Sequence, residues 1–322
     1  MDEVAPSSRA GRLGLLVGVV ALGAVLVGLS QLGEAEAFLA LARRASPQWL
    51  LVGLGMQAAT YATEAAAWGI VLRAGGRGLA PSRLYILAVI GLFTSQAVPS
   101  GGISGTVVVV RGMTAAGAPR RLAVAAVIVD LLGYYLAFGA TLAGALALLW
   151  ARRDLPPAVL AMAGGIAVLG GTICGGTLWL ATPGRVIPPR TRRIPGLSTA
   201  LEWLGDADQS LVRAPRLIGG AALSRLGNFV ADGLTLWACL RAVGTELGPA
   251  DAIAACVVGT LARTIGMVPG GLGTFEGGAV GGLALFGVAV EPALAATLLF
   301  RGLSFWLPML PGLWLGRREA RR

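Results

Sequence analysis

Long runs of apolar residues divide the chain into segments that are long enough to cross a membrane. A transmembrane helix needs about 20 consecutive, mostly apolar residues. The pattern therefore predicts six spanning helices, approximately over residues 13–32, 49–72, 122–150, 157–181, 217–241 and 292–316. The first run follows a basic start, as a signal peptide would, but it is longer than the usual signal-peptide core. Its length favours a retained helix.

Two further apolar stretches, residues 84–117 and 250–288, are too long for one crossing, and glycines interrupt each of them. The interruptions read VPSGGISG from residue 98 and VPGGLGT from residue 268, with the glycine pairs Gly101 and Gly102, and Gly270 and Gly271. Proline removes a backbone donor and glycine permits turn dihedrals, so each stretch is expected to be a re-entrant helical hairpin. A pair of ordinary kinked helices is the alternative.

Composition and charge placement agree with a polytopic membrane protein. The chain is 56% hydrophobic with a mean hydropathy of +0.76, more apolar than a soluble core of this length could hide. With both hairpins re-entrant and the N-terminus cytoplasmic, 17 of the 26 arginines fall in cytoplasmic segments, five outside and four in the membrane. This is the positive-inside pattern. It predicts a bacterial inner membrane protein with both termini cytoplasmic, and it argues against nucleic-acid binding despite the net charge of +10.

A repeat connects the two halves of the chain. Pro99 and Pro269 lie 170 positions apart, and Gln57 and Arg225 lie 168 positions apart. Three crossings in each half would place the second half in the membrane the opposite way up, which is a recurrent transporter plan. The predicted organisation is a tail (1–12), a first repeat (13–150), a second repeat (151–316) with a cytoplasmic loop (182–215), and a basic tail (317–322).

Eight ionisable residues lie inside the predicted spans and hairpins. They are Glu64, Asp130, Asp232 and Glu276, and Arg111, Arg225, Arg263 and Arg301. Each costs about 2.5–3.5 kcal/mol at a bilayer centre, so they are expected to face one another or a wet cavity. Arg225, Asn228 and Asp232 share one helix face by their spacing. Two readings stay open: a substrate site, or structural ion pairs that hold the bundle together.

The glycine loops suggest an anion site. A helix that begins after each reversal would direct unpaired N–H groups and a positive dipole end into the membrane, where they attract phosphate or carboxylate. Arg263 and Arg301 could complete such a site at the second loop, with Glu276 balancing one of them or taking up a proton.

Other chemistries lack candidate residues. The chain has no histidine, and Cys174, Cys239 and Cys256 are scattered singly, so neither a metal site nor a disulfide framework is expected. We also expect no cofactor and no enzymatic activity, because the sequence offers no nucleophile–base arrangement and no nucleotide-binding motif. Oligomeric state stays open. The glycine pairs Gly277/Gly281 and Gly278/Gly282 are expected to pack the hairpin inside its own bundle rather than to form a dimer.

The stretch RTIGMVPGGLGTFE, residues 263–276, followed by Arg301, resembles the flippase-like integral membrane domain of lysylphosphatidylglycerol synthases (the multiple peptide resistance factor). The resemblance covers roughly residues 13–316. It implies passage of phospholipid between leaflets, whereas aminoacyl transfer belongs to a separate soluble domain in that family and is not carried over. The first loop departs from the pattern, because Ser100 interrupts the Pro-Gly-Gly motif and Thr106 stands where an acidic residue is expected.

Three functions follow from these observations. The first is a translocator for an anionic or aminoacylated phospholipid or a polyprenyl-phosphate-linked lipid. The second is a non-transporting accessory subunit that presents membrane lipid to a lipid-modifying partner enzyme. The third is an intramembrane enzyme that acts on lipid, against which the missing catalytic residues argue.

Overall fold

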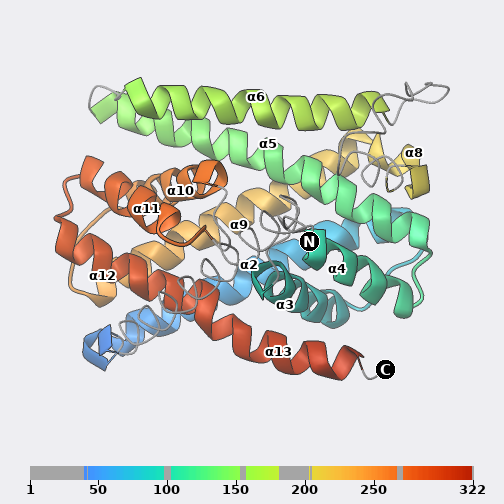
Figure 1. Ribbon diagram of the computed structural model, residues 1–322, viewed down its shortest axis with the longest axis horizontal. Coiled ribbons are helices and arrows are strands. Elements are labelled where there is room, and N and C mark those ends of the chain that lie inside the picture. The colour runs from blue at the N-terminus through green and yellow to red at the C-terminus, as the bar shows by residue number, and fades with distance from the viewer. Residues whose placement is uncertain are drawn as a thin grey trace, which may run out of the picture.

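The computed structural model describes residues 40–41, 43–97, 103–152, 157–180, 203, 205–266 and 271–320, and every regular element among them is a helix (Figure 1). The predicted all-α class is therefore confirmed. The helices are α2 (Pro47–Ala74), α3 (Pro81–Ala97), α4 (Ile103–Ala115), α5 (Arg120–Arg152), α6 (Pro157–Leu180), α8 (Gln209–Val212), α9 (Pro215–Ala242), α10 (Pro249–Gly266), α11 (Thr274–Leu285), α12 (Val290–Arg301), the π-helix η3 (Gly302–Trp306) and α13 (Leu307–Ala320).

Three helical stretches of the described part are long and apolar enough to cross a membrane. They are Arg120–Ala151, Ala163–Leu180 and Val290–Gly316, which match three of the predicted spans. Helices α2 and α9 cover two more predicted spans and are 28 residues long each, but they carry embedded polar side chains. The predicted span 13–32 and most of the predicted loop 182–215 lie outside the described residues. The full count of six spans stays a prediction.

Helix boundaries repeat along the chain with the predicted spacing. Pro47 and Pro215 begin α2 and α9, and both prolines lie in the first turn, where their missing N–H group would have had no helical partner. Pro81 and Pro249 begin α3 and α10 in the same way. Each of these pairs is 168 positions apart, as are Gly76 and Gly244, which follow α2 and α9 with positive φ angles of 78° and 79°.

Packing repeats as well. Helix α2 packs on α3 and α5, and α9 packs on the corresponding α10 and α12. Helix α5 also contacts α10, just as α13 contacts α3. The buried apolar side chains follow this division, with one core around α2 to α5, another around α9 to α12, and a third where α5, α9 and α10 meet.

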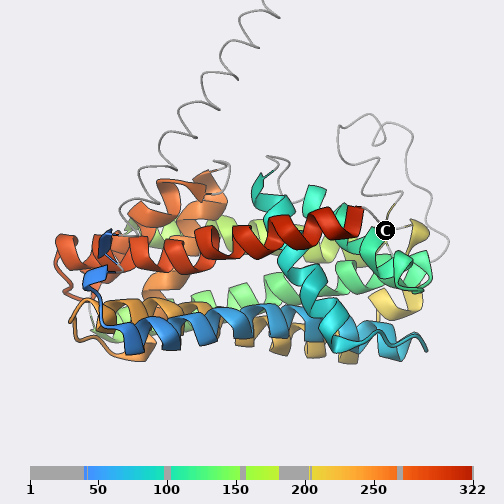
Figure 2. The ribbon, with the colours of Figure 1, turned by 90° about the horizontal axis from the view of Figure 1, so that it is seen from below.

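The two long equivalent helices, α2 and α9, lie side by side and run in opposite directions (Figure 2). Their hydrogen bonds show this direction. Gln57 bonds to Asp232, and Glu64, seven residues later on α2, bonds to Arg225, seven residues earlier on α9. Antiparallel packing of equivalent helices is the arrangement that an inverted repeat requires. The orientation of the two halves in the membrane stays a prediction.

Both predicted hairpins consist of two helices folded back on each other. Helices α3 and α4 pack together, as do α10 and α11, which excludes a single kinked helix in either stretch. Helices α4 and α11 have 13 and 12 residues, about 18–20 Å at 1.5 Å per residue, so neither could cross a hydrocarbon core of about 30 Å. The depth of the hairpins in the membrane stays a prediction.

Glycines allow the hairpin helices to approach closely. A Cβ atom at Gly112 would lie 2.2 Å from Leu87, and one at Gly282 would lie 3.0 Å from the backbone of Ala255. Gly278 also packs against α10, so the prediction for Gly278 and Gly282 is confirmed. The prediction is wrong for Gly277 and Gly281, where a Cβ would meet no described atom within 4 Å because both positions point away from α10.

The last helical stretch contains an irregularity that the apolar pattern did not predict. The residues between Arg301 and Leu307 form a π-helical turn. Pro308 follows directly and has no N–H group to donate to the carbonyl of Ser304, which explains why the hydrogen-bond ladder shifts there. The helix then continues to Ala320, so the predicted tail 317–322 begins as part of α13.

Candidate functional site

Arg225 lies at the centre of a polar cluster between the halves. Its Nε donates to Oδ1 of Asp130 at 2.6 Å, and Nη2 contacts the other oxygen of the same carboxylate. Nη2 also donates to Oε1 of Glu64 at 3.1 Å. The indole N–H of Trp68 donates to Asp130 as well, at 3.0 Å. One guanidinium therefore joins α2, α5 and α9 through two carboxylates, in the bidentate geometry that makes arginine–carboxylate pairs strong.

Asp232, seven residues further along α9, has different partners. It accepts a hydrogen bond from Nε2 of Gln57 at 3.1 Å and interacts electrostatically with Arg263. Between this contact and Arg225, Nδ2 of Asn228 donates to the backbone carbonyl of Thr60 at 3.1 Å. Sequence spacing placed Arg225, Asn228 and Asp232 on one helix face correctly.

The cross-helix contacts of this cluster are related by the internal repeat. Gln57 and Arg225 are equivalent positions, and so are Glu64 and Asp232, so the Gln57–Asp232 bond is the counterpart of the Arg225–Glu64 bond. The Asn228–Thr60 bond joins positions that are themselves 168 apart. The local pseudo-twofold axis therefore passes through the middle of the polar cluster.

The second glycine loop holds Arg263 in place. Gly271 has a φ of +66°, which side chains rarely adopt, so the expected need for glycine is confirmed. A Cβ at this position would lie 2.2 Å from Cγ and 2.5 Å from Cδ of Arg263. The apolar stem of Arg263 thus packs across Gly271 while the residue stays exposed. Gly270, Gly101 and Gly102 lie outside the described residues.

Arg301 and Glu276 form a separate ion pair within the second half. Nε of Arg301 lies 2.5 Å from Oε1 of Glu276, and their side chains are only 4% and 9% exposed. The guanidinium also lies over the ring of Phe305, 4.5 Å from its centroid. Arg263 and Arg301 were the two partners predicted for Glu276, and in the structure Glu276 pairs with Arg301. The pair is closed to solvent, so a role in binding substrate stays a prediction.

Arg111 lies apart from these groups. Its side chain is exposed on α4, and it forms no ion pair with a described residue. The central cluster consequently contains two arginines, Arg225 and Arg263, against the three carboxylates of Glu64, Asp130 and Asp232. Its carboxylates outnumber its arginines by one, which the count of eight balanced residues did not predict.

Sequence reasoning missed an apolar groove of about 440 Å³ beside this cluster. Residues of α2, α3, η3 and α13 line it, and Gln57 belongs both to the groove and to the Asp232 contact. Mostly apolar side chains from three distant segments make the walls, and none of them is unusual on its own. Among the described residues, no group of three or more His, Cys, Asp or Glu side chains is placed to hold a metal ion.

Comparison with known proteins supports the resemblance noted in the sequence. The family model described as "Lysylphosphatidylglycerol synthase TM region" matches residues 13–312. A search of curated proteins found no match. The family match extends over both halves, including all the ionisable residues of the polar clusters. The chain therefore belongs to the family of lysylphosphatidylglycerol synthase transmembrane regions.

Proposed function

We propose that this chain moves a lipid between the two leaflets of a bacterial inner membrane. The observation that carries the proposal is the polar cluster on the pseudo-twofold axis between α2 and α9. In transporters built from inverted repeats, substrate sites lie at the interface of the repeats, and access alternates when one repeat moves against the other. Bonds such as Gln57–Asp232 and Arg225–Glu64 cross this interface, so such a movement would remake them.

The charge of the cluster bears on the headgroup. Because the carboxylates outnumber the arginines, the cluster favours a ligand that brings positive charge, such as the ammonium group of an aminoacylated phospholipid. Asp232 is the best placed to receive it, since its only described hydrogen bond comes from the neutral amide of Gln57. The phosphate of the same lipid would find Arg263 nearby, at the second glycine loop.

Orientation is part of the proposal. We place both termini in the cytoplasm, because that arrangement puts most of the arginines of the chain on the cytoplasmic side. The first hairpin would then enter the membrane from the cytoplasm and the second from outside. Movement of lipid without a nucleotide-binding motif would run downhill or draw on an ion gradient.

A second function is favoured by the description of the family as a region of a synthase. In this alternative the chain presents lipid to a partner enzyme that modifies the headgroup, and it does not move lipid between the leaflets. The same groove and polar cluster would hold the lipid, but the bonds between the halves would stay intact.

Reconstituted vesicles separate the two functions. Fluorescent phosphatidylglycerol and an aminoacylated analogue are placed in both leaflets, and an impermeant reductant then bleaches only the outer pool. Vesicles with the protein are expected to lose the protected pool faster than empty vesicles. Asp232→Asn, which keeps the bond from Gln57, should slow the aminoacylated lipid most, whereas Asp206→Asn at an exposed ion pair should change nothing. Equal rates in protein-containing and empty vesicles, both with and without an ion gradient across the membrane, would reject the translocator and favour the presenting subunit.

A further inference from the structure

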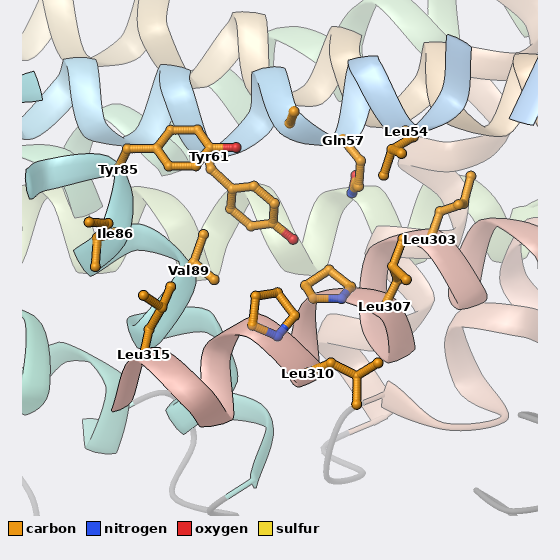
Figure 3. A pocket seen from close by; sticks show the side chains of 13 residues that line it. Leu54, Gln57, Tyr61, Tyr85, Ile86, Val89, Leu303, Leu307, Leu310 and Leu315 are labelled. Atoms are coloured by element: carbon orange, nitrogen blue, oxygen red, sulfur yellow. The ribbon is translucent and has the colours of Figure 1, made fainter. Parts of the chain in front are cut away.

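The groove beside the polar cluster has apolar walls and an apolar rim. Figure 3 shows the side chains of Tyr61 and Gln57 projecting from α2 toward α13, with leucines around them. Its volume of about 440 Å³ lies within the range of about 300–1,000 Å³ that is typical of small-molecule sites. Leu54 and Leu310 at its edge are 41% and 69% exposed. In a membrane, such a rim would meet hydrocarbon rather than water.

Two buried polar atoms of the groove have no hydrogen-bond partner among the described residues. They are Oε1 of Gln57 and the hydroxyl of Tyr61, whose residues are only 4% and 7% exposed. A buried, unpaired polar group destabilises the folded state, and most such groups in proteins are paired. Both residues line the groove, so a ligand that occupies it can supply the missing bonds.

The chemistry of the two atoms defines what they can bind. Nε2 of Gln57 already donates to Asp232, so the remaining Oε1 can only accept. The hydroxyl of Tyr61 can both donate and accept. A lipid hydroxyl meets both needs, because it can donate to Gln57 and accept from Tyr61, whereas ester and phosphodiester oxygens only accept.

We infer that this groove binds one hydrocarbon chain of a lipid and that Gln57 and Tyr61 hydrogen-bond a hydroxyl of the same lipid. The inference rests on the proposed function and specifies its substrate class as a lipid with a hydroxylated headgroup. Gln57 also bonds to Asp232 across the repeat interface. A ligand in the groove would therefore contact a residue that is hydrogen-bonded to the polar cluster.

Binding is measured on the full chain with phosphatidylglycerol that carries a photoreactive diazirine on one acyl chain. Phosphatidylethanol with the same acyl chains is the matched competitor, because it keeps the single negative charge and lacks the hydroxyls. Labelling is expected at the groove peptides that contain Leu303 and Leu310. Unlabelled phosphatidylglycerol should compete about 25-fold better than phosphatidylethanol, which corresponds to two net hydrogen bonds of about five-fold each.

Two pairs of variants test the assignment. Ala58 is exposed in the groove, so Ala58→Trp should fill it and remove the labelling, whereas Ala66→Trp, exposed on the same helix outside the groove, should not. Tyr61→Phe should reduce the advantage of phosphatidylglycerol over phosphatidylethanol about five-fold, because the bond to Gln57 remains. It should not lower thermal stability in lipid-free detergent, because the hydroxyl is unpaired there. Tyr135→Phe, on α5 and outside the groove, is the matched control and should leave the advantage intact.

Three results would overturn the inference. Labelling spread over the exposed helices and insensitive to Ala58→Trp would mean surrounding lipid rather than a site. Equal competition by the two lipids would remove the hydroxyl contact. An efficient disulfide between Ala58→Cys and a cysteine within residues 13–32 would show that the chain fills its own groove. Groove labelling together with normal competition but no lipid movement in vesicles would reject the proposed function and leave the groove assignment standing.

Discussion

The two hairpins of this protein share one backbone plan and differ in charge. In the first, Gly91 and Gly112 allow α3 and α4 to cross closely, and in the second Gly259 and Gly282 stand at the equivalent positions. A Cβ at Gly91 would lie 2.6 Å from Val109, and one at Gly259 would lie 3.0 Å from Ala279, which is the counterpart of Val109. Packing therefore constrains both hairpins in the same way.

Their polar residues follow no such repeat. Four residues after Gly259 stands Arg263, whereas Ser95 stands four residues after Gly91. Both side chains pack against a glycine of the following segment, Gly271 or Gly105. Glu276 likewise corresponds to Thr106, 170 positions earlier. The first hairpin carries Arg111, exposed on α4, but it has no ionisable residue at the positions equivalent to Arg263 and Glu276. The shared hairpin geometry therefore does not require the charges of these two residues.

The largest expected difference between the hairpins is the side of the membrane from which each loop is accessible to water. Single cysteines at Ser100 and Gly270, in a background that lacks the three native cysteines, should react with small impermeant thiol reagents from opposite sides of the membrane. We expect Ser100→Cys to react from the cytoplasm and Gly270→Cys from outside. Reaction of both from the same side would contradict the inverted arrangement, whatever the similarity of the two backbones.

The next largest effect is expected at Arg225. Arg225→Gln leaves the buried carboxylate of Asp130 beside the partly buried carboxylate of Glu64. Loss of one partner of a buried ion pair costs about 3–5 kcal/mol. Thermal unfolding in detergent should reveal a large loss of stability. Arg225→Gln combined with Asp130→Asn and Glu64→Gln should recover much of it, because no buried charge is then left unpaired. A triple variant no more stable than Arg225→Gln would show that the arginine does more than balance charge.

The identity of these partners shows what sequence could predict and what it could not. Hydrophobic runs located the described helices, and glycines with prolines located the breaks, since both signals are local. Helical spacing placed Arg225 and Asp232 on one face, but they lie about 10 Å apart along the axis, given a rise of 1.5 Å per residue. Their partners depend on the antiparallel register of α2 and α9, which Gln57 and Glu64 fix and which no local pattern encodes. The groove depends on the same long-range packing, so it was missed.

The ion pair of Arg301 and Glu276 in the second half allows the same test with a single carboxylate. Arg301→Gln leaves only Glu276 unpaired, so its destabilisation should be smaller than that of Arg225→Gln and toward the lower end of about 3–5 kcal/mol. Arg301→Gln combined with Glu276→Gln should be close to the wild type in thermal unfolding. A structural pair would also leave lipid movement normal in the double variant. Stable protein without lipid movement would instead place this pair in the transport mechanism.

Gly271 and Gly273 allow the contact with Arg263 to be isolated. Both have positive φ angles, +66° and +75°, so alanine at either position should cost about 1–2 kcal/mol in backbone strain. A Cβ at Gly273 would meet no described atom within 4 Å, whereas one at Gly271 would overlap the stem of Arg263. Gly271→Ala should therefore lose about 1–3 kcal/mol more. In an Arg263→Ala background the two alanine variants should become equal, and a persistent difference would reject this contact as the cause.

The smallest effect is expected where charge differs between the halves at an exposed position. Arg120 begins α5 and pairs with Asp206 at 2.9 Å, with side chains that are 62% and 46% exposed, and its counterpart 170 positions later is Val290. Exposed pairs contribute only about 0.2–1 kcal/mol, and salt screens them. Arg120→Gln should hardly change thermal unfolding and should leave the rate of lipid movement as it is. If Arg120→Gln slowed lipid movement as much as Asp232→Asn does, exposed and buried charges would contribute equally to function. Burial could then not be used to distinguish functional charges from other charges in either half.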